Sequence, residues 1–218
     1  MNKDPYNLIV TGVGGQGNVV ASQLIGAMLL SRGNFVTIGE TYGASQRGGS
    51  VMSHVRISLS RQYGPLIPPH AADLVMGLEP SEAVRVLAQF GNPKTIAVVN
   101  SRPVHSVDVI AGDAEYPDLQ ELHETIRSLS RQAIFVDATD KAMELGNPIL
   151  ANIILIGAVA AAGLLPVTEE DLATAVSDYM SPDKVEINLT AFQCGVGMVQ
   201  GPARCNTKTV SKMEDCRG

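Results

Sequence analysis

The chain has 218 residues, of which 45% are hydrophobic, so it can bury the core of one domain with at most a small appendage. Its net charge is −6, it has no run of Lys or Arg, and its aromatic content is 4% with no Trp. These values exclude a basic nucleic-acid track and leave few rings on which bases could stack, so we expect no nucleic-acid partner.

The N-terminal segment and the cysteines both indicate a cytoplasmic protein. Met1 to Pro5 lacks the apolar core of a secretory signal. The three cysteines, Cys194, Cys205 and Cys216, form no Cys-x-x-Cys pair, and an odd, scattered set is typical of reduced thiols. A cubane iron–sulfur cluster needs four thiolates, so we expect this chain to hold none by itself.

Short apolar runs alternate with helical patterns, which predicts an α/β fold with a mostly parallel sheet and crossover helices. The expected strands are Asn7–Thr11, Phe35–Ile38, Leu74–Gly77, Thr95–Asn100 and Ala133–Ala138. The expected helices are Asn18–Leu30, Pro80–Phe90, Pro117–Leu129, Ile149–Gly163, one capped by Thr168, and Asp183–Phe192. Between Val51 and Leu59, apolar and polar residues alternate, which predicts an antiparallel or edge strand with one wet face.

A glycine-rich turn, Gly12-Val13-Gly14-Gly15-Gln16-Gly17, joins the first expected strand to the first expected helix. Glycines let the backbone approach a phosphate, and the free N–H groups of the helix start point at it. The spacing fits G-x-G-x-x-G, and Glu40 follows the next apolar run, about where a ribose-binding acid would sit. The alternative is a tight connection with no ligand.

A second loop, Glu40 to Ser50, is too polar for a core and too rich in glycine for a helix. Backbone N–H groups beside the Arg47 guanidinium would suit a phosphate or a carboxylate. The loop leaves the carboxyl end of the second strand, so it should lie beside the first glycine turn. The predicted anion cleft consists of Gly12, Gly14, Gly15, Gln16, Gly17, Arg47, Gly48 and Gly49. The alternative is a flexible loop with a solvated arginine.

We identify no catalytic residue and no metal ligand. The histidines, His54, His70, His105 and His123, have no helix spacing and no nearby cysteine cluster. No G-x-S-x-G is present, and Asp137 at the end of a strand is expected to cap the next helix. The chain thus offers anion sites but no acid, base or nucleophile. This combination favours an accessory subunit that positions a ligand or a partner, rather than a complete catalyst.

The segment from Ile149 to Leu165 is nearly all apolar but falls short of the roughly 20 residues that a spanning helix needs. We predict a buried helix and no membrane association. Any face that it leaves exposed would make the chain self-associate when its partner is missing, and a homodimer would bury such a face.

The chain turns polar after Gly195. We therefore expect one domain over residues 1–195 and a polar C-terminal tail over residues 196–218, as a mobile tail or a docking arm.

These segments together resemble the gamma-type subunit of 2-oxoacid:ferredoxin oxidoreductases, and most closely the beta subunit of indolepyruvate:ferredoxin oxidoreductase. They follow the family order over about residues 5 to 195. The matching segments are Gly12–Gly17, Gln46–Val51, Ser53–Ile57, Pro65–Pro68, Ala72–Leu74, Leu78–Ala83, Val99–Pro103, Glu115–Asp118, Asp137–Ala138, Gly146–Asn147 and Asn188–Phe192. One departure is Tyr42-Gly43-Ala44-Ser45, where the indolepyruvate type is expected to have His-Gly-Met-Ala.

The resemblance implies a complex that oxidatively decarboxylates a 2-oxoacid to an acyl-CoA and CO2 and reduces ferredoxin. Thiamine diphosphate, Mg and the iron–sulfur clusters are then expected in the large catalytic subunit, with none in this chain and CoA as co-substrate. It also implies a three-layer α/β/α Rossmann-like sandwich that packs on the catalytic part and is inactive alone.

Two other functions stay open at this point. The chain could be a free-standing NAD- or FAD-dependent oxidoreductase that uses Gly12–Gly17 and Glu40. It could also be a non-enzymatic nucleotide-binding module.

Overall fold

The computed structural model describes residues 3–42, 49–105, 107–113, 115–179 and 181–201. The strands are β1 (Tyr6–Val13), β2 (Phe35–Tyr42), β3 (Ser50–Ser58), β4 (Leu74–Gly77), β5 (Ile96–Asn100) and β6 (Gln132–Val136). The helices are α1 (Asn18–Ser31), α2 (Pro80–Phe90), α3 (Val107–Ala111), α4 (Leu119–Leu129), α5 (Ala138–Glu144), α6 (Ala151–Ala161), α7 (Glu169–Tyr179) and α8 (Val185–Gln200), with 3-10 turns η1 (Pro148–Leu150) and η2 (Pro182–Lys184).

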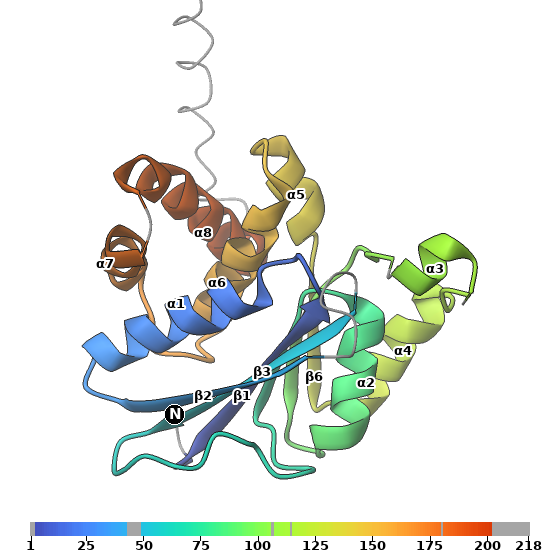
Figure 1. The fold of residues 1–218 in the computed structure, drawn as a ribbon, viewed down its shortest axis with the longest axis horizontal. Coiled ribbons are helices and arrows are strands. Elements are labelled where there is room, and N and C mark those ends of the chain that lie inside the picture. The colour runs from blue at the N-terminus through green and yellow to red at the C-terminus, as the bar shows by residue number, and fades with distance from the viewer. Residues whose placement is uncertain (1–2, 43–48, 106, 114, 180, 202–218) are drawn as a thin grey trace, which may run out of the picture.

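The strands form one six-stranded sheet in the order β2-β3-β1-β4-β5-β6 (Figure 1). β1, β4, β5 and β6 run parallel, whereas β3 is antiparallel to both of its neighbours, β1 and β2. Helices α1 and α6 cover one face, with α7 and α8 packed outside them, and α2 and α4 cover the other face. The predicted α/β fold with a mixed, mostly parallel sheet between helices is therefore confirmed.

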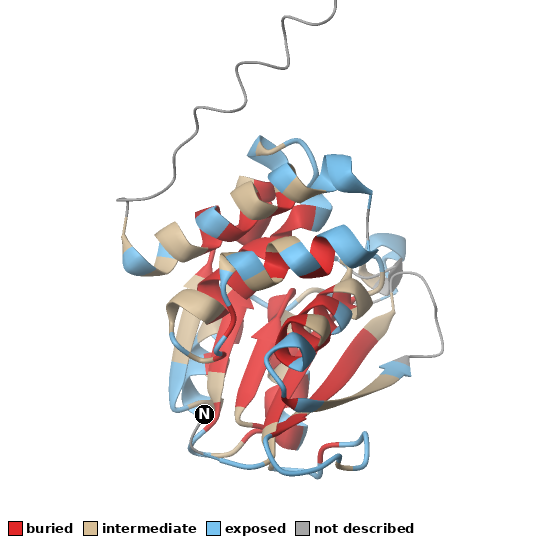
Figure 2. Ribbon diagram, turned by 90° about the vertical axis from the view of Figure 1, so that its left-hand side faces the viewer, coloured by how far each residue is buried: buried red, intermediate tan, exposed pale blue. Residues whose placement is uncertain are grey.

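The apolar strands are buried because helices cover them on both sides, as Figure 2 shows for the centre of the sheet. All residues of β4 are buried. One core cluster joins the sheet to α1 and α6, and a second joins it to α2, Ile67 and Ala72. All the strands expected from apolar runs are present, but β2 continues past Ile38 to Tyr42. Helix α3 was not predicted, and α5 was predicted only through the expectation that Asp137 caps a helix.

Local sequence signals explain where several helices begin. Pro80 opens α2, and the side chain of Glu79 accepts a hydrogen bond from the amide of Glu82. Asp118 caps α4 in the same way. The predicted capping box of α7 is present, since the Thr168 amide donates to Asp171 and the Asp171 amide donates back to Thr168 Oγ1.

The prediction for Val51–Leu59 is correct in that the strand is antiparallel, but wrong in that one of its faces would be exposed to solvent. β3 is antiparallel, yet it lies inside the sheet between β2 and β1, and β2 is the edge strand. Nearly all of β3 is buried, including His54. The chain between β3 and β4 covers the polar face, because Arg56 donates to the carbonyls of Gly64 and Leu66 and the Ile67 amide donates to His54 Nδ1.

The apolar segment after Pro148 is confirmed as a buried helix. Every residue of α6 from Ala151 to Val159 is buried beneath α8, and Leu165 is also buried. The expectation that this segment would drive self-association loses its basis, because the only large side chain that it exposes is Ile149.

The last helix is longer than predicted. α8 runs to Gln200 rather than ending near Phe192, because Gly195 faces α6 at a close helix crossing instead of ending the helix. The expected tail starts inside this helix, and residues 202–218 lie outside the described residues, so the boundary at 195 stays a prediction.

We expect the buried His54 to make stability depend on pH. Burial lowers the pKa of His54, so its ring stays neutral in the folded protein and Nδ1 accepts the Ile67 amide at 3.3 Å. Below about pH 6.5, the ordinary histidine value, the unfolded chain binds a proton that the folded chain does not. The free energy of unfolding is therefore full above that pH and falls as the pH drops toward the lowered folded pKa.

Urea unfolding at about pH 7.5 and about pH 5.5 measures this slope. His54→Asn keeps an acceptor for the amide but cannot titrate, so it should have a shallower slope than the wild type. An equal slope in both proteins would show that His54 does not carry the effect.

Candidate anion-binding site at the carboxyl edge of the sheet

The carboxyl ends of β1, β4, β5 and β6 meet the beginnings of α1, α2 and α5 at one edge of the sheet (Figure 1). β3 begins at the same edge, where Ser50 pairs with Val13. The Gly14 amide donates to the Gly49 carbonyl at 2.8 Å. The glycine turn and the end of the second loop are therefore in contact, whereas Arg47 and Gly48 lie outside the described residues.

The backbone of the turn needs glycine at several positions. Gly15 and Gly17 have φ of +104° and +80°, in the left-handed region. A Cβ on Gly12 would lie 2.9 Å from Leu78 Cβ and closer still to side-chain oxygens of Gln16 and Asn18. Gly15 is exposed, and nothing lies within 4 Å of where its Cβ would be. The turn is thus pressed against the sheet at Gly12 and open to solvent at Gly15.

The side chain of Gln16 stabilises the turn through two hydrogen bonds. Its Oε1 accepts the Val13 amide at 2.7 Å, and its Nε2 donates to the Leu78 carbonyl at 2.9 Å. Asn100, at the end of β5, donates to the same carbonyl at 3.2 Å. Gln16 thereby ties the end of β1 to the end of β4. Since both of its polar atoms are used inside the protein, its contribution to a ligand would be to hold the turn in shape.

The first turn of α1 offers donors for an anion. In the part of the chain that the structure describes, no residue accepts a hydrogen bond from the amides of Gly15, Gly17 or Asn18. The first turn of α1 contains no acidic residue that would compete. Asn152 of α6 fixes this helix start, because its Nδ2 donates to the Gly17 carbonyl at 3.2 Å. Amides and helix dipole together favour negative charge at this position.

Glu40 is not placed as a ribose-binding acid. In the Rossmann order the second strand lies directly beside the first, so an acid at its end faces the glycine turn. Here β3 is inserted between β1 and β2, and Glu40 pairs with Ser53 inside β2. This insertion moves Glu40 one strand spacing, about 4.8 Å, farther from the turn. The geometry weakens the dinucleotide interpretation.

A buried acid that sequence reasoning missed lies at the start of α2. Glu79 is completely buried; its Oε2 accepts Ser81 Oγ at 2.6 Å and the Glu82 amide at 2.9 Å. Its Oε1 accepts the hydroxyl of Tyr116. Burial and this bond raise the pKa of Tyr116 well above its usual range, so the phenol stays a donor. The available signal was a glutamate directly after an apolar strand and before a proline.

A second polar cluster holds the start of β3. Ser50 donates to Glu82 Oε2 at 2.6 Å, and Arg85 pairs with the same carboxylate at 2.7 Å. Arg85 also donates to Ser50 Oγ. The cluster anchors the base of the second loop to α2.

Asp137 occupies the N-cap position of α5, as expected, but its side chain makes no capping hydrogen bond. It accepts the hydroxyl of Ser101 instead.

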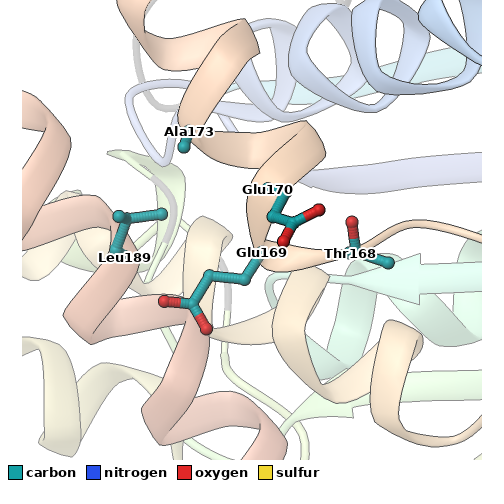
Figure 3. Close-up of a pocket in the computed structure, with 5 residues that line it drawn as sticks. All are labelled: Thr168, Glu169, Glu170, Ala173 and Leu189. Atoms are coloured by element: carbon teal, nitrogen blue, oxygen red, sulfur yellow. The ribbon is translucent and has the colours of Figure 1, made fainter.

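The described residues contain no group of three or more His, Cys, Asp or Glu side chains that could hold a metal ion. None of the helices in the described ranges is both long and apolar enough to cross a membrane. An open pocket of about 490 Å³ lies between α7 and α8, lined by Thr168, Glu169, Glu170, Ala173 and Leu189 (Figure 3). None of these residues belongs to the carboxyl edge of the sheet.

Comparison with known proteins gives consistent matches. Residues 7–198 match the family model described as pyruvate ferredoxin/flavodoxin oxidoreductase. The chain is 35% identical over 192 residues to indolepyruvate oxidoreductase subunit IorB of Thermococcus kodakarensis, covering 88% of this chain and 94% of that protein.

Two solved structures share the fold. The gamma subunit of a keto/oxoacid ferredoxin oxidoreductase from Geobacter sulfurreducens aligns with a TM-score of 0.64 at 23% identity, over 89% of this chain and 98% of that one. A 2-oxoglutarate:ferredoxin oxidoreductase from Magnetococcus marinus, with 2-oxoglutarate, coenzyme A and succinyl-CoA bound, aligns with a TM-score of 0.69 at 21% identity, over 94% of this chain and 33% of that one.

Proposed function

Because the chain belongs to the pyruvate ferredoxin/flavodoxin oxidoreductase family, as a subunit of a 2-oxoacid:ferredoxin oxidoreductase, we propose that its complex oxidises indolepyruvate or a related aryl 2-oxoacid. The products are the acyl-CoA, CO2 and reduced ferredoxin. The observation that carries the choice of substrate is the match to the indolepyruvate oxidoreductase subunit over 94% of that protein's length.

The chain acts in this proposal by binding and positioning, and the large partner subunit performs the chemistry. Thiamine diphosphate with Mg supplies the decarboxylation chemistry, and iron–sulfur clusters carry the electrons to ferredoxin. The donor set of the described residues does not suit either group, since the one cysteine among them, Cys194, is buried in the core and they include no cluster of metal ligands. We place both groups in the partner subunit.

CoA, or a carboxylate of the partner subunit, is the anion that we assign to the carboxyl edge. The support is the contact between Gly14 and Gly49, which joins the two donor-rich loops, together with the open amides at the start of α1. The Magnetococcus marinus enzyme, which shares the fold, holds bound coenzyme A in its solved structure.

Purification through a tag on this chain from its native host tests the function. We expect a large brown partner subunit to accompany it, and the complex to oxidise indolepyruvate with CoA and a viologen dye. The isolated chain should be inactive. Turnover by the isolated chain, or reduction of NAD by it, would overturn the accessory role, and ligand binding without turnover or partner would favour a nucleotide-binding module.

Arg47→Ala tests the anion cleft. The variant should fold normally and weaken the binding of CoA or of the partner by about 1.5–3 kcal/mol, the range for a hydrogen bond to a charged group. Arg47→Lys should recover only part of this, because it restores the charge but not the two-pronged geometry. The measurement is the apparent CoA affinity and the subunit affinity of the reconstituted complex.

Arg131→Ala is the matched control, since Arg131 is exposed beside the amino end of β6, at the opposite edge of the sheet. If Arg47→Ala, like this control, leaves both affinities unchanged within about twofold, a difference below about 0.5 kcal/mol, the arginine has no role in the cleft.

A further inference from the structure

The edge strand β2 presents a surface that none of the functions above uses. It spans Phe35 to Tyr42, pairs only with β3, and no described residue hydrogen-bonds to the outer side of its main chain between Phe35 and Gly39. Figure 2 shows it at the margin of the sheet, half-buried beside the buried β3. A long edge strand with unpaired backbone groups is a template for another strand.

β2 also lacks the features that usually protect an edge. Between Phe35 and Thr41 it contains no proline, and Glu40 is its only charged residue. Exposed apolar side chains flank its amino end: Phe35 is 44% exposed, Leu30 before it is 54% exposed, and Leu59, next to the cross-strand partner of Phe35, is 70% exposed. The edge therefore favours association over solvation.

We propose that β2 pairs antiparallel with β2 of a second copy of this chain, centred on Ile38, so that two sheets join into one. In this register, Ile38 lies opposite Ile38 of the second copy, and Val36 lies opposite Glu40. Phe35 lies opposite Thr41, an aromatic and β-branched pair of the kind that stabilises sheets. This inference is independent of the proposed function.

Charge, the two faces of the sheet and the length of the strand together favour this register, in which every residue from Phe35 to Thr41 is paired. Residues on one face must meet residues on the same face, and Val36 and Ile38 face α1, because both lie near Gly26. Centring on Glu40 would place two carboxylates directly opposite each other. Centring on Ile38 separates them by four residues, about 13 Å along the strand. The strand is therefore complementary to itself in this register.

Thr37→Glu tests the interface. Thr37 pairs with Arg56 within the chain, so a new carboxylate there has an opposite charge nearby and the fold should stay stable. At the centre of the joined sheet, the same carboxylate would lose solvent beside its symmetry copy. We expect the wild-type chain to be a dimer by sedimentation equilibrium, and Thr37→Glu to raise the dimer Kd at least about tenfold while its circular dichroism spectrum stays that of the folded wild type. Thr174→Glu, on the exposed side of α7, adds the same charge elsewhere and should leave the Kd unchanged.

Cross-linking tests the register in the assembled complex. In a background with Cys205→Ser and Cys216→Ser, Ile38→Cys should form a disulfide between two copies, whereas Val36→Cys on the same face should not. A monomeric wild type, or a dimer indifferent to Thr37→Glu, would overturn the proposal. The proposal would also be overturned if Thr37→Glu weakened only the binding of the large subunit and not dimer formation, because β2 would then contact that subunit.

Discussion

Gly195→Ala should lower the free energy of unfolding by about 3 kcal/mol, the upper part of the range for overpacking a core. A Cβ at Gly195 would lie 2.8 Å from the carbonyl carbon of Ile154 and 2.9 Å from the amide nitrogen of Ala158, and would overlap the Ile154 carbonyl oxygen. The contact is reciprocal, since a Cβ on Gly157 would overlap the carbonyl of Phe192. Because the neighbours are backbone atoms of a buried helix, neither side can move away by changing a rotamer.

The loss of stability expected for Gly195→Ala is opposite in sign to the effect that helix propensity alone would give. Within a helix, alanine is normally more stable than glycine by about 0.5–1 kcal/mol, so propensity alone predicts a gain. Gly26→Ala in α1 is the matched control, because its Cβ would be tight only against the flexible end of Ile38, at 2.9 Å, and in ordinary contact with Val36 Cγ1, at 3.7 Å. Urea unfolding followed by circular dichroism measures both variants. A Gly195→Ala protein as stable as the control would show that α6 and α8 do not cross this closely.

Glu79→Ala should also destabilise the protein by about 3 kcal/mol. The loss of the N-cap contributes about 1 kcal/mol, and the hydrogen-bond donors left without an acceptor contribute about 1–3 kcal/mol. The buried carboxylate accepts the Tyr116 hydroxyl, the Ser81 hydroxyl and the Glu82 amide. Tyr116→Phe removes one donor and should cost about 1–2 kcal/mol. Since each variant removes the same bond, the double variant should cost less than the sum of the two single variants.

Tyr179→Phe is the control for this cycle, because Tyr179 is 63% exposed at the end of α7. It should change the free energy of unfolding by less than about 0.5 kcal/mol. Additive effects of Glu79→Ala and Tyr116→Phe would mean that the hydroxyl and the carboxylate do not interact in solution.

Much of the architecture could be predicted from local patterns. Apolar runs bounded by turns predicted β1, β4, β5 and β6, a first-turn proline predicted where α2 begins, and a capping threonine predicted where α7 begins. These signals act within a few residues of one another, so they can be recognised without knowing what packs against them. The glycine turn and its contact with the end of the next loop were also predicted, and the bond from Gly14 to Gly49 confirms the contact.

The candidate site was predicted less completely, because its stabilising contacts join distant parts of the chain. Glu79 and Tyr116 are 37 residues apart, and nothing in either neighbourhood indicates the other. Gln16 was identified as a site residue, but only the structure shows that its amide bridges β1 and β4. Arg47 and Gly48 remain predictions.

The sequence by itself determined which segments form strands and helices, where the glycine turn lies and which family the chain resembles, because each depends on residue types within a short window. Only the tertiary structure decided that β3 enters the sheet between β1 and β2, which displaces Glu40 from the turn and leaves β2 at the edge. It alone decided that Gly195 is a helix contact rather than a helix end. Strand order and helix crossings depend on which distant surfaces fit together, and local periodicity carries no information about that fit.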